Sequence, residues 1–241
     1  MFKMKELNLN LLLILFVIVF LPCCSPESKN LEQATGNNGH TNIKNMSTPT
    51  GERLLPAEEG PVISAFGEPV IDLNTFKLEI TGLVDSSFSL TWDEIRGLKE
   101  YPTDTILMYC VEGFEVWGVW EGIRVEDLLS KARVRSAGGY ILFSSVDGYS
   151  INLPISYLKT YKVMLAYNVN GSPLRPGDGF PLRLIAFGKY GYKWAKWVSK
   201  IEVIDQSQAS IGDSSGISHQ DDVPVSVRKY YEGPDVKPLE Y

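Results

Sequence analysis

An uninterrupted apolar run at residues 11–21 limits which part of this 241-residue chain can form a globular domain. The run follows a short positive region with Lys3 and Lys5, and the four residues after it read Pro-Cys-Cys-Ser. A helix of about this length is too short to cross a hydrocarbon layer of about 30 Å. The pattern is typical of a secretory signal peptide, which takes no part in the fold. We therefore expect residues 1–23 to be a signal peptide and the remainder to lie outside the cytoplasm.

A cysteine directly after such a run resembles a bacterial lipobox, because Leu21 stands three residues before Cys24. We predict that Cys24 is lipidated, with Cys23 as the second choice. The alternative is an uncleaved anchor segment. Both interpretations predict an exported chain held on a bacterial cell membrane, at its periplasmic or extracellular face.

Polar, poorly patterned segments flank a patterned centre. Residues 24–58 are rich in Asn, Ser, Thr, Gly, Glu and Lys, and cannot bury enough apolar surface to offset their ordering entropy. We interpret them as a flexible tether, residues 59–206 as one domain, and residues 207–241 as a C-terminal tail. The net charge of −6 argues against nucleic acid as a partner, since phosphate binding needs a clustered basic surface.

Apolar patterning between the flanks predicts a mixed α+β domain. Thr91 with Glu94 forms a capping box that opens a short helix, and Asn170-Gly171 is a strong hairpin signal. Strands outnumber helices, so we expect mainly antiparallel or mixed sheets with short helices. The helices are expected at 91–98 and 125–132, and the strands at 76–80, 105–110, 140–145, 149–153, 164–169, 181–187 and 197–204.

Cys110 is the one thiol left when Cys23 is removed and Cys24 is acylated. Lone cysteines are common as small buried apolar residues, and this interpretation stays open. The position at the end of an apolar strand, before a glycine-containing loop, favours a functional site instead. The two histidines, His40 and His219, lie in the flanking segments, which argues against a Cys–His nucleophile or a zinc site. What remains is a thiolate on a soft metal whose other ligands come from a cofactor.

A second cluster lies at residues 181–184 and 188–197, where four cations and four aromatics are punctuated by two glycines. Cations bind phosphate, aromatic rings offer planar contacts, and glycine allows a ligand to approach the backbone closely. The alternative is a surface strand with solvated lysines. No phosphate-binding glycine motif of the P-loop or dinucleotide type occurs, so nucleotide cofactors have no support.

Together these features resemble the oxidoreductase molybdopterin-binding domain of sulfite oxidases and of bacterial periplasmic methionine sulfoxide reductases. The resemblance runs from about Pro61 to Asp205. Three stretches carry it by their order and spacing: Tyr109-Cys110-Val111-Glu112-Gly113 with Trp120-Glu121-Gly122; Asp147-Gly148-Tyr149; and Pro181-Leu182-Arg183 through Lys193-Trp194-Ala195-Lys196-Trp197.

The resemblance implies a molybdenum–molybdopterin cofactor, with Cys110 as metal ligand and catalytic residue. Further residues match cofactor-binding positions: Arg183, which would hold the pterin and its phosphate; Lys196 at the cofactor, with Lys193 and Tyr192 nearby; Asp178, where relatives often carry His or Asn; and Ser145, a polar contact beside Asp147. The implied reaction is oxygen-atom or two-electron transfer at a small sulfur- or nitrogen-containing substrate, with an external electron carrier or a membrane redox subunit as partner.

The N-terminus departs from the family pattern, because residues 1–10 contain no Arg-Arg pair. Relatives export the folded, cofactor-loaded protein by the twin-arginine route. A second departure is that the residues after Asp205 are too few for the dimerisation domain of the sulfite oxidases proper. A non-catalytic lipid-anchored binding module without metal is therefore the alternative function. A thiol-based redox protein is disfavoured, since no second Cys or nearby His accompanies Cys110.

Overall fold

The computed structural model describes residues 54–136, 138–206, 212 and 222–223. The predicted signal peptide with Cys23 and Cys24, most of the tether and most of the C-terminal tail lie outside the described residues. Within the described ranges, no helix is long and apolar enough to cross a membrane.

The first sheet is organised around one long central strand, β5 (Glu115–Arg124). Along one edge, β5 pairs with the antiparallel strand β4. Along the other edge, it pairs first with the parallel strand β1 and then with the antiparallel strand β8. Two further strands, β9 and β10, pair antiparallel with β8. The bounds of these partners are β1 Leu55–Pro56, β4 Tyr101–Tyr109, β8 Met164–Val169, β9 Ser172–Pro173 and β10 Arg183–Ile185.

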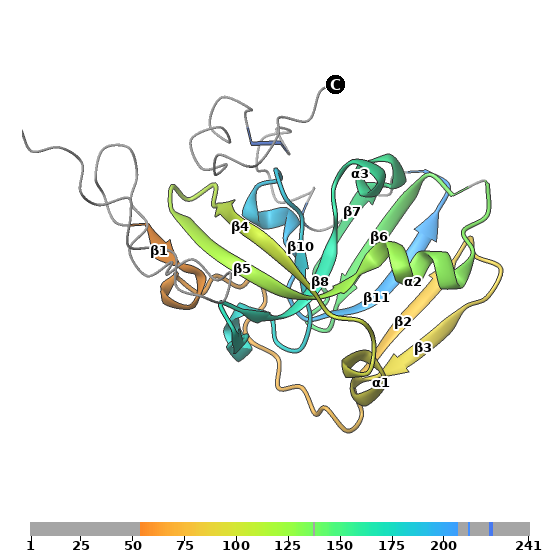
Figure 1. Cartoon of the computed structure of the whole chain (residues 1–241), viewed down its shortest axis with the longest axis horizontal. Helices are drawn as coiled ribbons and strands as arrows, with labels where there is room; N and C mark the ends of the chain where they lie inside the picture. The colour runs from red at the N-terminus through yellow and green to blue at the C-terminus, as the bar shows by residue number, and fades with distance from the viewer. Residues whose placement is uncertain (1–53, 137, 207–211, 213–221, 224–241) are drawn as a thin grey trace, which may run out of the picture. The chain divides into compact units, whose positions relative to one another are not determined.

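The second sheet has five strands in the order β3-β2-β11-β6-β7 (Figure 1). The β2–β11 pair is parallel and the other three pairs are antiparallel. Their bounds are β2 Lys77–Gly82, β3 Phe88–Thr91, β6 Tyr140–Ser145, β7 Ser150–Pro154 and β11 Val198–Ile204.

Short helices connect and cover the sheets. The amphipathic helix α2 (Val125–Ala132) contacts β2 of one sheet and β5 and β8 of the other, so its apolar face helps to join them. Helix α1 (Trp92–Arg96) begins at the predicted capping box, in which the Thr91 side chain accepts from the Glu94 N–H. Helix α3 (Ile155–Thr160) follows β7. Buried side chains from both sheets and from the helices form one continuous hydrophobic core.

The predicted α+β class is confirmed, and several predicted elements agree with the structure to the residue. They are α2, β6 and β8, and the Asn170-Gly171 turn joins β8 to β9 with positive φ at both residues. The sequence also left some elements unassigned: β1, β3, α3 and the whole of β5. The short helix expected at 91–98 ends at Arg96.

Strand β5 is not predicted by the sequence patterning, although its residues 115–124 form the central strand of the first sheet. A Cβ atom at Gly122 would lie 2.0 Å from the Leu165 carbonyl oxygen, so the close approach of β8 requires glycine there. The strand is also buried on both faces over much of its length, which removes the alternation that marks a half-buried strand.

Described residues on both sides of the predicted domain contact it. Leu54 is buried, and β1 pairs with β5 although it falls in the segment expected as tether. In the expected tail, Val223 is buried and its N–H donates to the Gly188 carbonyl. These two flanks therefore contribute contacts to the domain.

Replacing Gly122 with alanine should lower the free energy of unfolding by about 1–3 kcal/mol or more, because the new methyl group forces β5 and β8 apart. Gly97→Ala is the matched control: φ at Gly97 is −81°, and a Cβ there has nothing closer than 3.4 Å. It should change stability by less than about 0.5 kcal/mol. Denaturant titration of both variants checks this, and equal losses would contradict it.

Candidate active site

A cavity of about 400 Å³ lies where four parts of the fold meet. These are the end of β4, the β6–β7 turn, the segment around β10, and an N-terminal wall formed by residues 57–65. Residues 191–197, between β10 and β11, complete the lining. Stretches far apart in the sequence therefore supply the side chains of one cavity.

Cys110 lies directly after β4 and lines this cavity. Its N–H donates to the Phe114 carbonyl at 2.8 Å, and its own carbonyl accepts from the Gly113 N–H at 3.1 Å. Burial raises the pKa of the Cys110 thiol, and the negative charge of Glu112 raises that pKa further. A cation bound at the sulfur would favour the thiolate. Among the described residues, no group of three or more His, Cys, Asp or Glu could hold a metal ion by itself.

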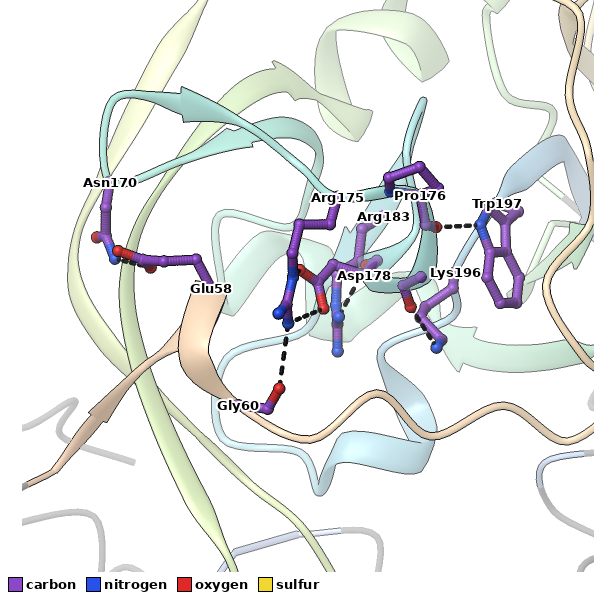
Figure 2. A network of polar contacts seen from close by, with 10 residues as sticks. Glu58, Gly60, Asn170, Arg175, Pro176, Asp178, Arg183, Lys196 and Trp197 are labelled. Carbon is purple, nitrogen blue, oxygen red and sulfur yellow. Dashed lines mark hydrogen bonds and ion pairs between the residues drawn. The ribbon is translucent and has the colours of Figure 1, made fainter.

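Three consecutive backbone carbonyls hold three side chains beside the cavity (Figure 2). They belong to the short 3-10 helix η4 (Pro176–Asp178). The Trp197 indole N–H donates to the Pro176 carbonyl at 2.8 Å, and the Lys196 ammonium donates to that of Gly177 at 2.7 Å. The Arg183 guanidinium donates to the Asp178 carbonyl at 2.8 Å. This turn therefore fixes the positions of both cations that line the cavity.

Arg183 is a buried cation, and one of its hydrogen-bond donors has no acceptor. Its Nη2 donates to the Met108 sulfur at 3.0 Å, whereas its Nε has no hydrogen-bond partner. The indole Nε1 of Trp120, a second lining residue, is also buried without a partner, and the guanidinium lies 5.5 Å from that ring. Burial lowers the pKa of Arg183 to about 10, so it stays charged at neutral pH. Buried donors without acceptors are costly, and a ligand rich in acceptors would satisfy them.

Lys196 is the second cation of the cavity and is more sensitive to pH. Burial, and after it the positive charge of Arg183, lowers the pKa of Lys196 to about 8. The ammonium also lies 4.5 Å from the Trp197 ring centroid. Two neighbouring cations in a partly buried cavity create a site that favours an anionic group.

Asp178 also lines the cavity, but both of its carboxylate oxygens bind Arg175. What Asp178 offers to Arg183 is its backbone carbonyl. Tyr192 lines the cavity, and its own carbonyl accepts from the Tyr149 hydroxyl at 2.7 Å.

The structure brings five of the seven predicted site residues to one cavity: Cys110, Asp178, Arg183, Tyr192 and Lys196. Lys193 and Ser145 are buried but do not line it, although Ser145 ends the strand next to the lining residue Asp147. The Ser145 hydroxyl has no hydrogen-bond partner. The roles of all seven residues stay predictions.

Sequence reasoning missed three contributors to the site: Arg175, the indole of Trp120 and the wall at residues 57–65. Arg175 and Asp178 are oppositely charged residues three positions apart, which is a usable sequence signal for a local ion pair. No local pattern would have placed the wall, because its contacts join residues more than 100 positions apart.

The cavity fits a cofactor that brings most of its own metal ligands and carries negative charge. One thiol faces it, with no accompanying cluster of metal-ligating side chains in the described part of the chain. Arg183 and Lys196 supply the positive charge, and two buried N–H groups lack acceptors. These are the properties required to bind a metal through one protein thiolate and to hold an anionic organic group.

Comparison with known proteins points in the same direction. The family model described as oxidoreductase molybdopterin binding domain matches residues 65–211. The uncharacterized oxidoreductase YuiH of Bacillus subtilis (strain 168) is 31% identical over 146 residues, which are 60% of this chain and 73% of that protein. A putative protein-methionine-sulfoxide reductase subunit, YedZ1 of Azospira oryzae, is 26% identical over 147 residues, covering 61% of this chain and 55% of that protein.

Two further relatives are larger proteins. The mitochondrial sulfite oxidase of Rattus norvegicus is 27% identical over 173 residues, so that 59% of this chain matches 31% of that protein. Among solved structures, the sulfane dehydrogenase SoxCD from Paracoccus pantotrophus matches with a TM-score of 0.54 at 22% identity, over 73% of this chain and 50% of that one. The structural match shows a shared fold.

The pKa of Lys196 makes a testable contribution to stability. The ordinary value of 10.5 applies to the unfolded chain, and the folded value is about 8. Between these values the unfolded chain binds more protons, so stability rises with pH in that window. The free energy of unfolding of the wild type, relative to Lys196→Met, should therefore increase between pH 8 and pH 10.5.

Lys196→Arg is the matched control, because arginine keeps its charge throughout this range. Its free energy of unfolding relative to Lys196→Met should show no such increase. Urea titrations at several pH values provide the measurement. If the free energy of unfolding differs between wild type and Lys196→Met by the same amount at every pH, the lowered pKa of Lys196 is contradicted.

Proposed function

The chain belongs to the oxidoreductase molybdopterin-binding domain family, and we propose that it is a molybdenum-dependent oxidoreductase held on the outer face of the cell membrane. The family membership confirms the predicted molybdopterin cofactor. The dependence on molybdenum, the reaction and the location are parts of the proposal.

The observation that carries the proposal is the shared cavity of Cys110, Arg183 and Lys196. Cys110 would supply the thiolate to the metal. Arg183 and Lys196, held by consecutive carbonyls of η4, would bind the anionic part of the pterin. When bound, the molybdenum centre would supply oxygen-atom or two-electron transfer, which the side chains of this cavity cannot perform themselves.

The chain's own residues prepare the cavity for that chemistry. The η4 carbonyls keep the two cations in place before any ligand arrives, so little ordering is needed on binding. Apolar residues of the wall, among them Val62 and Ile63, flank the cavity and reduce its exposure to water. The thiol of Cys110, whose pKa is raised, would lose its proton to solvent when the metal binds.

The substrate we propose is a small sulfur- or nitrogen-containing molecule. The names of the relatives, which include a sulfite oxidase and a putative methionine-sulfoxide reductase subunit, support this class. An external carrier or a membrane redox subunit would exchange electrons with the site, because the sequence contains no haem-attachment Cys-x-x-Cys-His and no iron–sulfur cluster spacing.

Protein purified from its own host should contain about one molybdenum per chain, together with pterin, and Cys110→Ala should lose the metal because its one protein ligand is gone. Val111→Ala, an exposed neighbour in the same cavity lining, is the matched control and should retain it. Elemental analysis and pterin fluorescence provide the measurement. Wild-type protein from the native host without molybdenum or pterin would support the non-catalytic binding module instead.

We propose that Cys24, outside the described residues, carries the lipid anchor. Cys24→Ser should move the protein from the membrane to the soluble fraction, while Cys23→Ser should leave it membrane-bound. Metabolic labelling with a fatty acid, followed by fractionation, distinguishes these variants. Labelling that survives Cys24→Ser but not Cys23→Ser would transfer the anchor to Cys23.

A further inference from the structure

Arg175 connects two parts of the cavity that are far apart in sequence (Figure 2). Its guanidinium binds Asp178 through two nitrogens, Nε to Oδ2 and Nη2 to Oδ1, the second at 2.9 Å. The same Nη2 donates to the Gly60 carbonyl at 3.1 Å. One side chain therefore bridges η4, which holds Lys196 and Arg183, and the wall at residues 57–65.

The wall is anchored near its N-terminal end, where Ala57 is buried. A second polar link joins Glu58 to the Asn170 side chain at 2.7 Å, and Asn170 in turn accepts from the Val119 N–H. Beyond Gly60 the wall is poorly buried, since Val62 and Ile63 are each 41% exposed. Apolar burial alone therefore contributes little to holding this half of the wall against the cavity.

The wall also comes very close to η4. A Cβ atom at Gly177 would lie 2.7 Å from Val62 Cγ1 and 2.7 Å from Glu68 Oε1. The carbonyl of that same glycine accepts from Lys196. Displacing the wall would therefore open space beside Gly177, whose carbonyl places Lys196.

The bridge has the properties of a strong contact. The Asp178 side chain is 8% exposed, which limits the solvent screening that weakens surface ion pairs, while the Arg175 side chain is 41% exposed. Two-nitrogen binding of a carboxylate by guanidinium adds geometric specificity that an ammonium lacks. Losing Arg175 would also leave a buried carboxylate without its counterion, close to the site proposed for an anionic group.

We propose that Arg175 is a positioning residue, which holds the wall at residues 57–65 against η4 and so closes the cavity over Arg183 and Lys196. With respect to the cofactor, the inference rests on the proposed function: a cavity closed in this way retains the pterin. The positioning itself is a property of the chain alone.

Hydrogen–deuterium exchange of the full chain tests the positioning directly. In Arg175→Ala, the hydrogen-bonded amide of Gly60, which donates to the Ala57 carbonyl at 3.2 Å, should exchange about tenfold faster, the effect of losing one charge-assisted hydrogen bond. Amides of β11 should keep their wild-type rates, which shows that the fold is intact. Arg175→Lys keeps the positive charge but cannot bind the carboxylate through two nitrogens, so it should protect the wall from exchange only partly.

Two further variants separate the bridge from general effects. Asp178→Asn replaces the carboxylate by a neutral amide, whose NH2 group cannot accept from Arg175, so the ion pair and one of its two hydrogen bonds are lost; this variant should loosen the wall as Arg175→Ala does. Arg135→Ala breaks an exposed ion pair with Asp85 at 3.4 Å that lies outside the cavity lining, and should leave the wall unchanged. Unchanged exchange in both Arg175→Ala and Asp178→Asn, or equal loosening in Arg135→Ala, would overturn the proposal.

Cofactor retention provides the second readout. Molybdenum remaining after extended dialysis should fall faster in Arg175→Ala than in the wild type or Arg135→Ala. A wall that loosens without faster loss of molybdenum would overturn the link to retention. If the wild type holds no molybdenum, the proposed function fails, while the exchange measurements still decide the role of Arg175.

Discussion

Burying positive charge beside a cavity requires acceptors that do not neutralise it, and η4 supplies them. Three successive backbone carbonyls accept from Trp197, Lys196 and Arg183. Carbonyl oxygens satisfy the donors and leave the net charge of the cations available to a ligand. Carboxylates at the same places would cancel that charge. The positive character of the cavity therefore depends on this one short turn.

Burial lowers the pKa of both cations, and they respond differently to pH because the ordinary pKa of arginine is higher than that of lysine. Arg183 is buried and its pKa is lowered to about 10, yet it remains protonated under physiological conditions. Burial, and after it the charge of Arg183, lowers the pKa of Lys196 to about 8. An anion bound between them would favour the charged form of Lys196 and raise its pKa again.

Local signals in the sequence point to three residues that the structure brings to one cavity. Cys110 follows an apolar strand and precedes a glycine turn, and Arg183 and Lys196 lie in a dense cluster of cations and aromatics. The sequence patterning did not predict β5. This strand contains Gly122, and the neighbouring strand lies so close that only a residue without a side chain fits there. The patterning also failed on the wall, because hydrogen bonds such as Arg175 to Gly60 join residues too far apart for any periodicity to reveal.

Asp178 shows how a residue that is predicted to contact the cofactor can line the cavity while another side chain holds its carboxylate. The resemblance predicts it as a cofactor contact, and it does line the cavity. Its carboxylate, however, is engaged by Arg175, which removes a negative charge that would oppose an anionic group. Its carbonyl holds Arg183 at the same time. An acidic residue thus becomes compatible with a cation-lined site because a neighbouring arginine neutralises it, and that arginine is then available to fix the wall.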